Sequence, residues 1–204
     1  MSDTIIRSLE ELAARYGTPS DTSLAKEADH LTAHYRAFVE AAPFVLIASV
    51  GPEGLDCSPR GDPAGFVAIE DERTLLLPDR LGNNRVDTLT NIVRDPRISL
   101  LFLIPGIGET LRVSGTGEID TAADLLERFA MNGKLPRSVL RVRIASVYFQ
   151  CQKALVRSRL WDPASQVDRR SLPSTGEMLA ARMADFDGAK YDADYPERLK
   201  QTIY

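Results

Sequence analysis

The stretch LLLPDRLGNNR at residues 75–85 decides how the middle of this chain folds. Its leucines indicate a buried strand that stops at Pro78, and Gly82 indicates a turn. A short amphipathic helix is expected to start at Asn84 and Arg85, because asparagine is a favoured N-cap residue. The apolar side of that helix is expected to hold four residues, Val86, Leu89, Ile92 and Val93.

This predicted helix start is a candidate anion site. The first N–H groups of a helix lack internal partners, and the helix dipole places partial positive charge there. With the guanidinium of Arg85, these donors suit a phosphate group. Arg80 lies in the turn, and Arg60 lies one hairpin upstream. A capped surface helix is the alternative, but a phosphate site at a strand end favours a nucleotide-like cofactor.

Composition limits the class of protein. The 204 residues are 44% hydrophobic and 26% charged, as expected for one globular domain with helical appendages. The net charge of −4 lacks the basic excess of a general nucleic-acid binder. No apolar run reaches the roughly 20 residues of a membrane span, and no signal peptide is recognisable. We therefore expect a cytoplasmic protein with no membrane or nucleic-acid partner.

Cysteine and histidine offer little chemistry. Cys57 and Cys151 are expected to be reduced, buried or partly buried structural thiols. His30 and His34 are four residues apart on a predicted helix, a spacing that suits a metal ligand pair, but no further ligand is evident. A solvated helix face is the preferred interpretation, so no metal site is predicted.

The pattern of hydrophobic residues changes along the chain. Helices are expected at about Thr4 to Ala14 and Leu24 to Ala41. Strands are then expected at seven places: Phe44 to Val50, Leu55 to Pro59, Phe66 to Ile69, Thr74 to Leu77, Ile98 to Ile104, Thr110 to Ile119 with a possible bulge at Gly115, and Val139 to Phe149. Further helices are expected at Ala122 to Met131, after the capping-box sequence STGE at 174–177, and at Tyr191 to Tyr204; Lys153 to Trp161 is either a short helix or an extended arm.

Strands in succession with few intervening helices predict a mainly β protein with peripheral helices (α+β). The expected core is a six- or seven-stranded antiparallel barrel. The chain divides into a helical segment at 1–42 that packs on the barrel, a barrel domain at 43–165 and a helical tail at 166–204.

Two further groups of arginines lie near small polar residues. SPRGDP at 58–63 joins two strands, and either it is an ordinary turn or Arg60 and Asp62 face a ligand. CQKALVRSRLWDP at 151–163 follows the last strand and contains the single tryptophan, Trp161. Cations beside an indole suit a planar anionic ligand, although a lone tryptophan also fills cores and interfaces.

The order and spacing of these motifs resemble the pyridoxamine 5′-phosphate oxidase-like flavoproteins. The similar segments are SPRGD at 58–62, LPDR and GNNR within 77–85, DPR at 95–97, LRVSG at 111–115 and the run at 151–163. The branch that this chain resembles is the PPOX-class probable FMN-dependent enzymes. Gly61-Asp62-Pro63 replaces an Arg…Leu-Lys pattern of the true oxidases, and the C-terminal segment has no histidine, so a true pyridoxine phosphate oxidase is not expected.

The resemblance implies a split β-barrel of Greek-key type that forms a homodimer, with FMN at the subunit interface. Arg60 would lie along the flavin, Asn83, Asn84 and Arg85 would hold the phosphate, and Thr110 and the 153–161 arm would come from the partner. The expected cofactor-binding residues are Ser58, Arg60, Asp62, Leu77, Pro78, Arg80, Asn83, Asn84, Arg85, Thr110, Lys153, Arg157, Ser158 and Trp161.

The expected function is an FMN-dependent oxidoreductase acting on an unidentified small molecule. The sequence identifies no general acid or base. The alternatives are a non-catalytic split barrel that binds or senses flavin, haem or a deazaflavin, and a structural dimer whose arginines form interface salt bridges.

Overall fold

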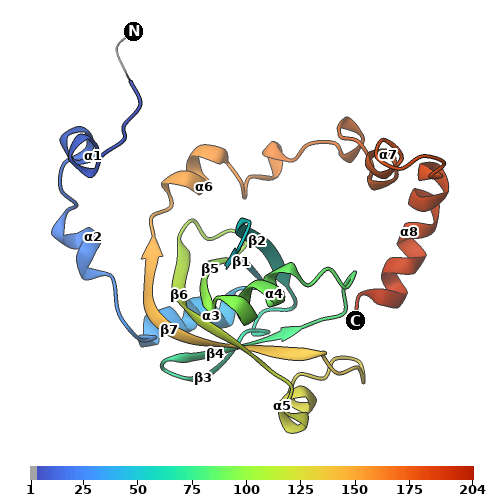
Figure 1. Ribbon diagram of the computed structural model, residues 1–204, viewed down its shortest axis with the longest axis horizontal. Coiled ribbons are helices and arrows are strands. Elements are labelled where there is room, and N and C mark those ends of the chain that lie inside the picture. The colour runs from blue at the N-terminus through green and yellow to red at the C-terminus, as the bar shows by residue number, and fades with distance from the viewer. Residues whose placement is uncertain (1–3) are drawn as a thin grey trace.

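The computed structural model describes residues 4–204, so the first three residues of the predicted 1–42 segment lie outside the described part. The described residues form one seven-stranded antiparallel sheet with the order β2-β1-β5-β6-β7-β4-β3 (Figure 1). The strands are β1 (Phe44–Gly51), β2 (Gly54–Gly61), β3 (Ala68–Asp71), β4 (Thr74–Asp79), β5 (Arg97–Leu103), β6 (Thr110–Asp120) and β7 (Ser138–Gln150).

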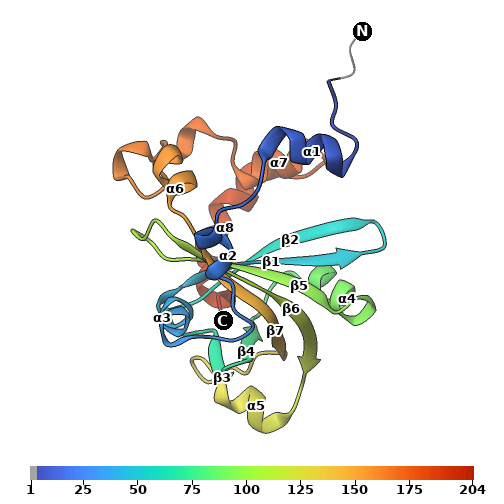
Figure 2. The same cartoon turned by 90° about the vertical axis from the view of Figure 1, so that its left-hand side faces the viewer.

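Helices surround this sheet rather than alternating with its strands. They are α1 (Leu9–Tyr16), α2 (Asp21–Ala25), α3 (Ala33–Ala41), α4 (Asp87–Arg94), α5 (Ala123–Arg128), α6 (Lys153–Ser158), α7 (Thr175–Ala180) and α8 (Gly188–Thr202), with 3₁₀ turns η1 (Pro163–Ser165) and η2 (Arg169–Ser171). The sheet curves strongly, and β1 and β4 each pair across a crossover (Figure 2). The predicted fold class, a mainly β split barrel with peripheral helices, is confirmed.

The leucine run of β4 is continuous because both faces of the strand are covered. Leu75 and Leu77 belong to the main core inside the barrel. Leu76 points the other way, into a smaller cluster with Leu125 and Phe129 of the α5 segment. Buried residues on successive positions therefore reflect two separate packing layers on this strand.

The strand does not stop at Pro78 as predicted but runs to Asp79. β3 pairs with β4 as far as Leu76, so the following residues of β4 have a neighbour only in β7 on the described sheet. A proline is tolerated where a strand has a free edge, because its missing N–H costs no ladder hydrogen bond there.

The predicted helix from Leu24 to Ala41 is wrong, because two helices with an extended segment between them occupy this region. Ala28 exchanges both backbone hydrogen bonds with Val147 of β7, and the N–H of Leu31 donates to Glu72 at 2.7 Å. These contacts stop α2 before it can join α3. His30 therefore lies in the connection, where its ring contacts Asp29, and does not share a helix face with His34.

The predicted start of α4 at Asn84 is also wrong. The helix begins at Asp87 with Val86 as its N-cap, and no side chain caps it. Asn84 has a φ of 63°, a left-handed conformation that asparagine tolerates well. Of the four residues predicted on its apolar side, Ile92 is buried and Leu89 is partly buried, whereas Val86 and Val93 are exposed. Thr88 is the other buried residue of the helix.

Both cysteines are exposed, which corrects the expectation of buried or partly buried thiols. Cys57 lies on the outward face of β2, an edge strand whose burial alternates along its length. Cys151 directly follows β7, where the chain leaves the sheet. Edge position and chain exit explain the exposure of the two thiols.

The segments outside the barrel differ in how they are held. α3 packs on the sheet and buries Val39, whereas α1 buries no residue. In Figure 1, α6 to α8 run above the barrel and down its right-hand side, and the last residues return to it near the β4–α4 loop. The capping box at Ser174 and Glu177 is confirmed, and α8 begins before Tyr191. Among residues 4–204, every helix is too short or too polar to span a bilayer.

Candidate functional site

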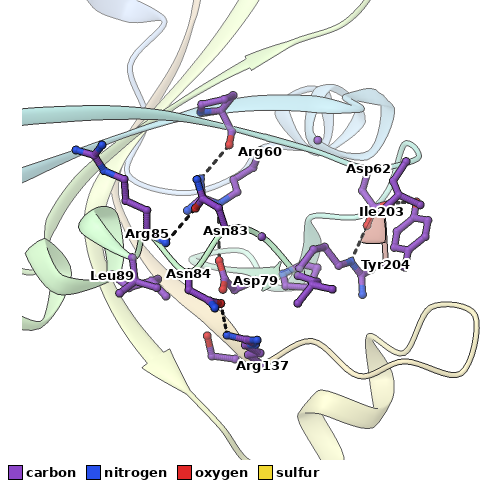
Figure 3. Close-up of a pocket in the computed structure, with 18 of the residues that line it drawn as sticks. Arg60, Asp62, Asp79, Asn83, Asn84, Arg85, Leu89, Arg137, Ile203 and Tyr204 are labelled. Carbon is purple, nitrogen blue, oxygen red and sulfur yellow. Dashed lines mark hydrogen bonds and ion pairs between the residues drawn. The ribbon is translucent and has the colours of Figure 1, made fainter. Parts of the chain in front are cut away.

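A pocket of about 550 Å³ lies where the ends of β2 and β4 meet the β4–α4 loop, the start of β7 and the residues that follow α8 (Figure 3). Predicted residues and residues that the sequence did not indicate both line this pocket. The lining residues are Pro59, Arg60, Gly61, Asp62, Phe66, Pro78, Asp79, Arg80, Leu81, Gly82, Asn83, Asn84, Arg85, Val86, Leu89, Arg137, Ser138, Ile203 and Tyr204.

Amide and guanidinium groups form one end of the pocket. The side-chain oxygen of Asn84 accepts a hydrogen bond from Nη1 of Arg137 at 2.5 Å, which holds the left-handed loop in place. Asn83 accepts a hydrogen bond from the backbone N–H of Arg85 at 3.0 Å. Figure 3 shows Arg85, Asn83 and Asn84 on the side away from Asp62 and Tyr204, with Arg137 below them. The residues of the predicted anion site thus lie on a loop beside Arg137 rather than at a capped helix start.

Arg85 lies on the rim of this end. Its side chain is 79% exposed, and its Nε contacts Oδ2 of Asp87 at 2.5 Å. The hydrogen bond that it donates to Asp87 raises the pKa of Arg85 above its ordinary value, so the guanidinium stays charged. Arg85 is therefore available to a ligand only in competition with its own aspartate.

The opposite end of the pocket contains an ion pair that the C-terminal segment covers. Nε of Arg80 donates to Oδ2 of Asp62 at 2.7 Å, and the side chain of Asp62 is 1% exposed. The hydroxyl of Tyr204 donates to Oδ1 of the same carboxylate at 2.6 Å. The Arg80 guanidinium also lies 5.8 Å from the centre of the Tyr204 ring.

Asp79 lies between the two ends of the pocket. Its carboxylate is 3.9 Å from Nε of Arg60, and burial raises the pKa of Asp79 above its ordinary value. Arg60 in turn donates to its neighbour, the carbonyl of Pro59, at 2.9 Å. Burial thus disfavours the ionised form of this carboxyl group, and the nearby Arg60 guanidinium partly offsets that effect.

The pocket is positively charged although the chain is acidic. Within residues 4–204, four arginine and two aspartate side chains line it, which leaves two positive charges when all are ionised. A phosphate monoester carries about −1.5 to −2 charges at neutral pH, so its negative charge is similar in size and opposite in sign to that of the lining side chains. Phe66, Pro78 and Leu89 add apolar wall next to the charged groups.

Seven of the predicted residues line this pocket, and the other seven do not. The lining ones are Arg60, Asp62, Pro78, Arg80, Asn83, Asn84 and Arg85. Leu77 is buried in the main core, and the hydroxyl of Ser58 donates to Asp56 at 3.2 Å. The remaining five lie elsewhere in the same chain, at the start of β6 and in the α6 arm: Thr110, Lys153, Arg157, Ser158 and Trp161.

Those five residues have local surroundings of their own. Thr110 is 8% exposed and its hydroxyl donates to Gln150 at 3.3 Å. The indole N–H of Trp161 donates to the carbonyl of Ile107 at 2.8 Å. Lys153, Arg157 and Ser158 are exposed on α6. Within one chain, the structure does not bring these residues to the pocket.

The lining residues that the sequence did not indicate include Asp79, Arg137, Ile203 and Tyr204. The sequence does hold a signal for Asp79, because this polar residue directly follows the buried part of the strand. Arg137 precedes β7 and Tyr204 follows α8, and no local pattern links either to residues 60–85.

A family model described as pyridoxamine 5′-phosphate oxidase matches residues 31–151, more than half of the chain. The chain belongs to the pyridoxamine 5′-phosphate oxidase family. This is a family of flavin-binding split barrels, and the match covers β1 to β7 and all of the pocket except Ile203 and Tyr204. A search of curated proteins returned no match.

Several solved structures resemble the barrel of this pyridoxamine 5′-phosphate oxidase family member. HupZ from Group A Streptococcus is 17% identical, with a TM-score of 0.45, and 56% of this chain and 89% of that chain are covered. A Clostridium acetobutylicum protein related to general stress protein 26 is 15% identical, with a TM-score of 0.46 and 58% and 86% covered. An F420 reductase is 16% identical, with a TM-score of 0.41 and 59% and 98% covered.

Proposed function

We propose that this protein is an FMN-dependent oxidoreductase that acts on a small molecule other than pyridoxine phosphate. The observation that carries this proposal is the positively charged pocket of about 550 Å³ in a chain of a flavin-binding family. That volume lies within the roughly 300–1,000 Å³ of small-molecule sites. FMN combines a planar ring with a phosphate, and the pocket combines apolar wall with a cationic end.

The residues present fit such a cofactor by their chemistry. Arg137, Asn84 and Arg85 supply guanidinium and amide donors for the phosphate. Charge-assisted hydrogen bonds of this kind contribute about 1.5–3 kcal/mol each. Arg60 and Asp79 offer one positive charge and one carboxyl group with a raised pKa farther along the pocket.

Bound flavin would supply the redox chemistry, and the protein supplies binding, orientation and charge. Arg60 would favour an anionic ligand beside it. Asp79 is a candidate for proton transfer to or from a ligand, because it lines the pocket and burial raises its pKa above its ordinary value. The apolar lining, including Phe66 and Leu89, would limit water around the ligand.

We also propose that the active unit is a homodimer. Thr110 and the residues of α6 lie outside the pocket of their own chain, so a second copy would have to bring them to it. α6 exposes 60% of Val156, and the following Leu160 is 48% exposed. Exposed apolar residues that cluster on one arm are typical of interaction surfaces.

The test of the function is the absorbance spectrum of the freshly purified protein, followed by titration of the apo-protein with FMN. Flavin bands, micromolar or tighter FMN affinity, and turnover with NADH or NADPH and an electron acceptor are the expected results. A colourless protein that does not bind added FMN would contradict the proposal. FMN binding without any turnover would instead favour a flavin-binding or sensing protein, and binding of haem or a deazaflavin in place of FMN would identify a different ligand on the same barrel.

A further inference from the structure

We infer that Tyr204 is a wall residue of the candidate flavin pocket and that its hydrogen bond to Asp62 is the latch that fastens the α7–α8 tail to the barrel. This inference rests on the proposed function, because the flavin pocket is the site that the latch would complete. Residues 203 and 204 lie far outside the segment that the family model matches, which ends at residue 151. They nevertheless line the pocket together with β2 and β4 (Figure 3).

The latch has a defined attachment point. The Tyr204 hydroxyl donates to a carboxylate whose side chain is 1% exposed, that of Asp62. Nζ of Lys134 donates to the backbone oxygen of Tyr204, and at 3.4 Å to that of Gln201. Arg80 lies over the Tyr204 ring while it pairs with Asp62. A buried charged acceptor gives this hydrogen bond more weight than one on the surface.

The rest of α8 is held mainly by the tail itself. α8 packs against α7, and their close approach requires Gly176, where a Cβ would lie 2.1 Å from the carbonyl of Gly188. No residue of α8 is buried. The contacts of Tyr204 and Lys134 therefore tie this helical pair to the barrel at the edge of the pocket.

The size of the pocket shows that Tyr204 is a wall and not a plug. With Tyr204 docked, about 550 Å³ remains, which is within the range for a small-molecule site. Figure 3 places Tyr204 and Asp62 at the end away from Arg85 and Asn84. Loss of the wall should therefore weaken every ligand of the pocket, whether or not the ligand carries a phosphate.

The experiment compares Tyr204→Phe with the wild type, using FMN and riboflavin as probes of the apo-protein. The substitution keeps the ring and removes the hydroxyl that reaches Asp62. The apparent affinity scales with the fraction of molecules in which the tail is docked. The affinities for FMN and for riboflavin should therefore fall by the same factor, on the order of three- to tenfold. Tyr195→Phe is the matched control, because Tyr195 lies on the same helix but does not line the pocket, and its affinities should be unchanged.

Hydrogen exchange gives a second readout that does not depend on activity. Amides of residues 199–204 should exchange faster in apo Tyr204→Phe than in the wild type, and saturating FMN should slow them in the wild type. Equal FMN and riboflavin affinities in wild type and Tyr204→Phe would overturn the latch, as would a loss confined to FMN. A wild type that binds neither probe would contradict the proposed function, and the latch inference with it.

Discussion

Arg137 is the residue whose importance the structure raises most. Arg85 is, with Asn83 and Asn84, one of the residues that the sequence assigns to the phosphate, yet its side chain is 79% exposed and pairs with Asp87. Arg137 instead holds Asn84 through a hydrogen bond and lines the pocket from the β7 side. The cationic end thus depends on two segments that are separated by a large part of the barrel sequence.

Substitution of Arg137 by alanine is expected to lower the affinity for FMN about 10- to 150-fold, because it removes a charge-assisted hydrogen bond of about 1.5–3 kcal/mol. The affinity for riboflavin, which lacks the phosphate, should fall far less. Titration of the apo-protein with both ligands measures the difference. Arg94→Ala is the control, since Arg94 lies on α4 outside the pocket. Equal losses for FMN and riboflavin would remove the phosphate role.

The partly buried position of Asp79 predicts how the thermal stability of the protein depends on pH. Burial raises the pKa of Asp79 above its ordinary value of 3.8, so the ionised form costs stability in the folded state. Asp79→Asn should therefore raise the Tm at pH 7, and the gain should shrink as the pH falls through the raised pKa toward 3.8. Thermal melts between about pH 3 and 8 test this expectation.

Substitution of Asp71 is expected to change the Tm at pH 7 in the opposite direction. Hydrogen bonds, chiefly from the backbone N–H of Arg73, lower the pKa of Asp71 below 3.8, so its ionised form stabilises the fold above that pH. Asp71→Asn should lower the Tm at pH 7, and this loss should fade as the pH falls through the lowered pKa. Two variants that shift the Tm in the same direction at pH 7 would refute the electrostatic assignment.

Among the elements, the β6–β7 pair depends on a bulge at Gly115. The register shifts between Ser114 and Gly115, as the sequence suggested. A Cβ at Gly115 would lie 1.9 Å from the carbonyl oxygen of Arg143, which is a backbone atom that cannot move freely. Gly115 is therefore required by close approach of the two strands.

Gly115→Ala is expected to destabilise the protein by about 1–3 kcal/mol, the usual cost of forcing extra volume into a packed region. Denaturant unfolding measures this loss. Gly82→Ala is the matched control, because no atom lies within 4 Å of its added Cβ. Similar stabilities for the two variants would show that the bulge relaxes at little cost.

Local patterns predicted the elements whose hydrogen bonds and burial are local. The strands were found because their apolar runs face the core, and the capping box at Ser174 was found because it is complete within four residues. The break between α2 and α3 was missed because Val147 of β7 imposes it on Ala28. The start of α4 was missed because Arg137 holds Asn84 in a left-handed loop.

The candidate site follows the same rule. Arg60 and the residues of the β4–α4 loop were identified from charge and turn chemistry, since they lie close together in sequence. Tyr204 reaches Asp62 across the whole barrel sequence, and no periodicity reports such a contact. The roles of Thr110 and the α6 residues stay a prediction that requires a second chain.

At the scale of the molecule, the arms that leave the barrel carry exposed apolar surface. Leu9 on α1 is 79% exposed and Val156 on α6 is 60% exposed. Light scattering is expected to give the mass of a dimer. Val156→Asp should shift it toward the monomer and weaken FMN binding, because a buried carboxylate at an interface carries a large desolvation cost.

Val93→Asp provides the control for that experiment, because Val93 is 75% exposed on α4, away from the arms. It is expected to stay a dimer with unchanged FMN affinity. A wild type that elutes and scatters as a monomer would contradict the dimer proposal. So would a Val156→Asp variant that keeps both the dimer mass and the FMN affinity of the wild type.

The position of Tyr204 in the sequence also affects the order of events during synthesis. β7 ends at Gln150, and the residues from there to Tyr204 are made afterwards. At about 5–20 residues per second, a ribosome needs roughly 3–11 s for that stretch. The barrel segments of the nascent chain are therefore made several seconds before Tyr204, and a cofactor that bound in that interval would meet a pocket that still lacks its Tyr204 wall.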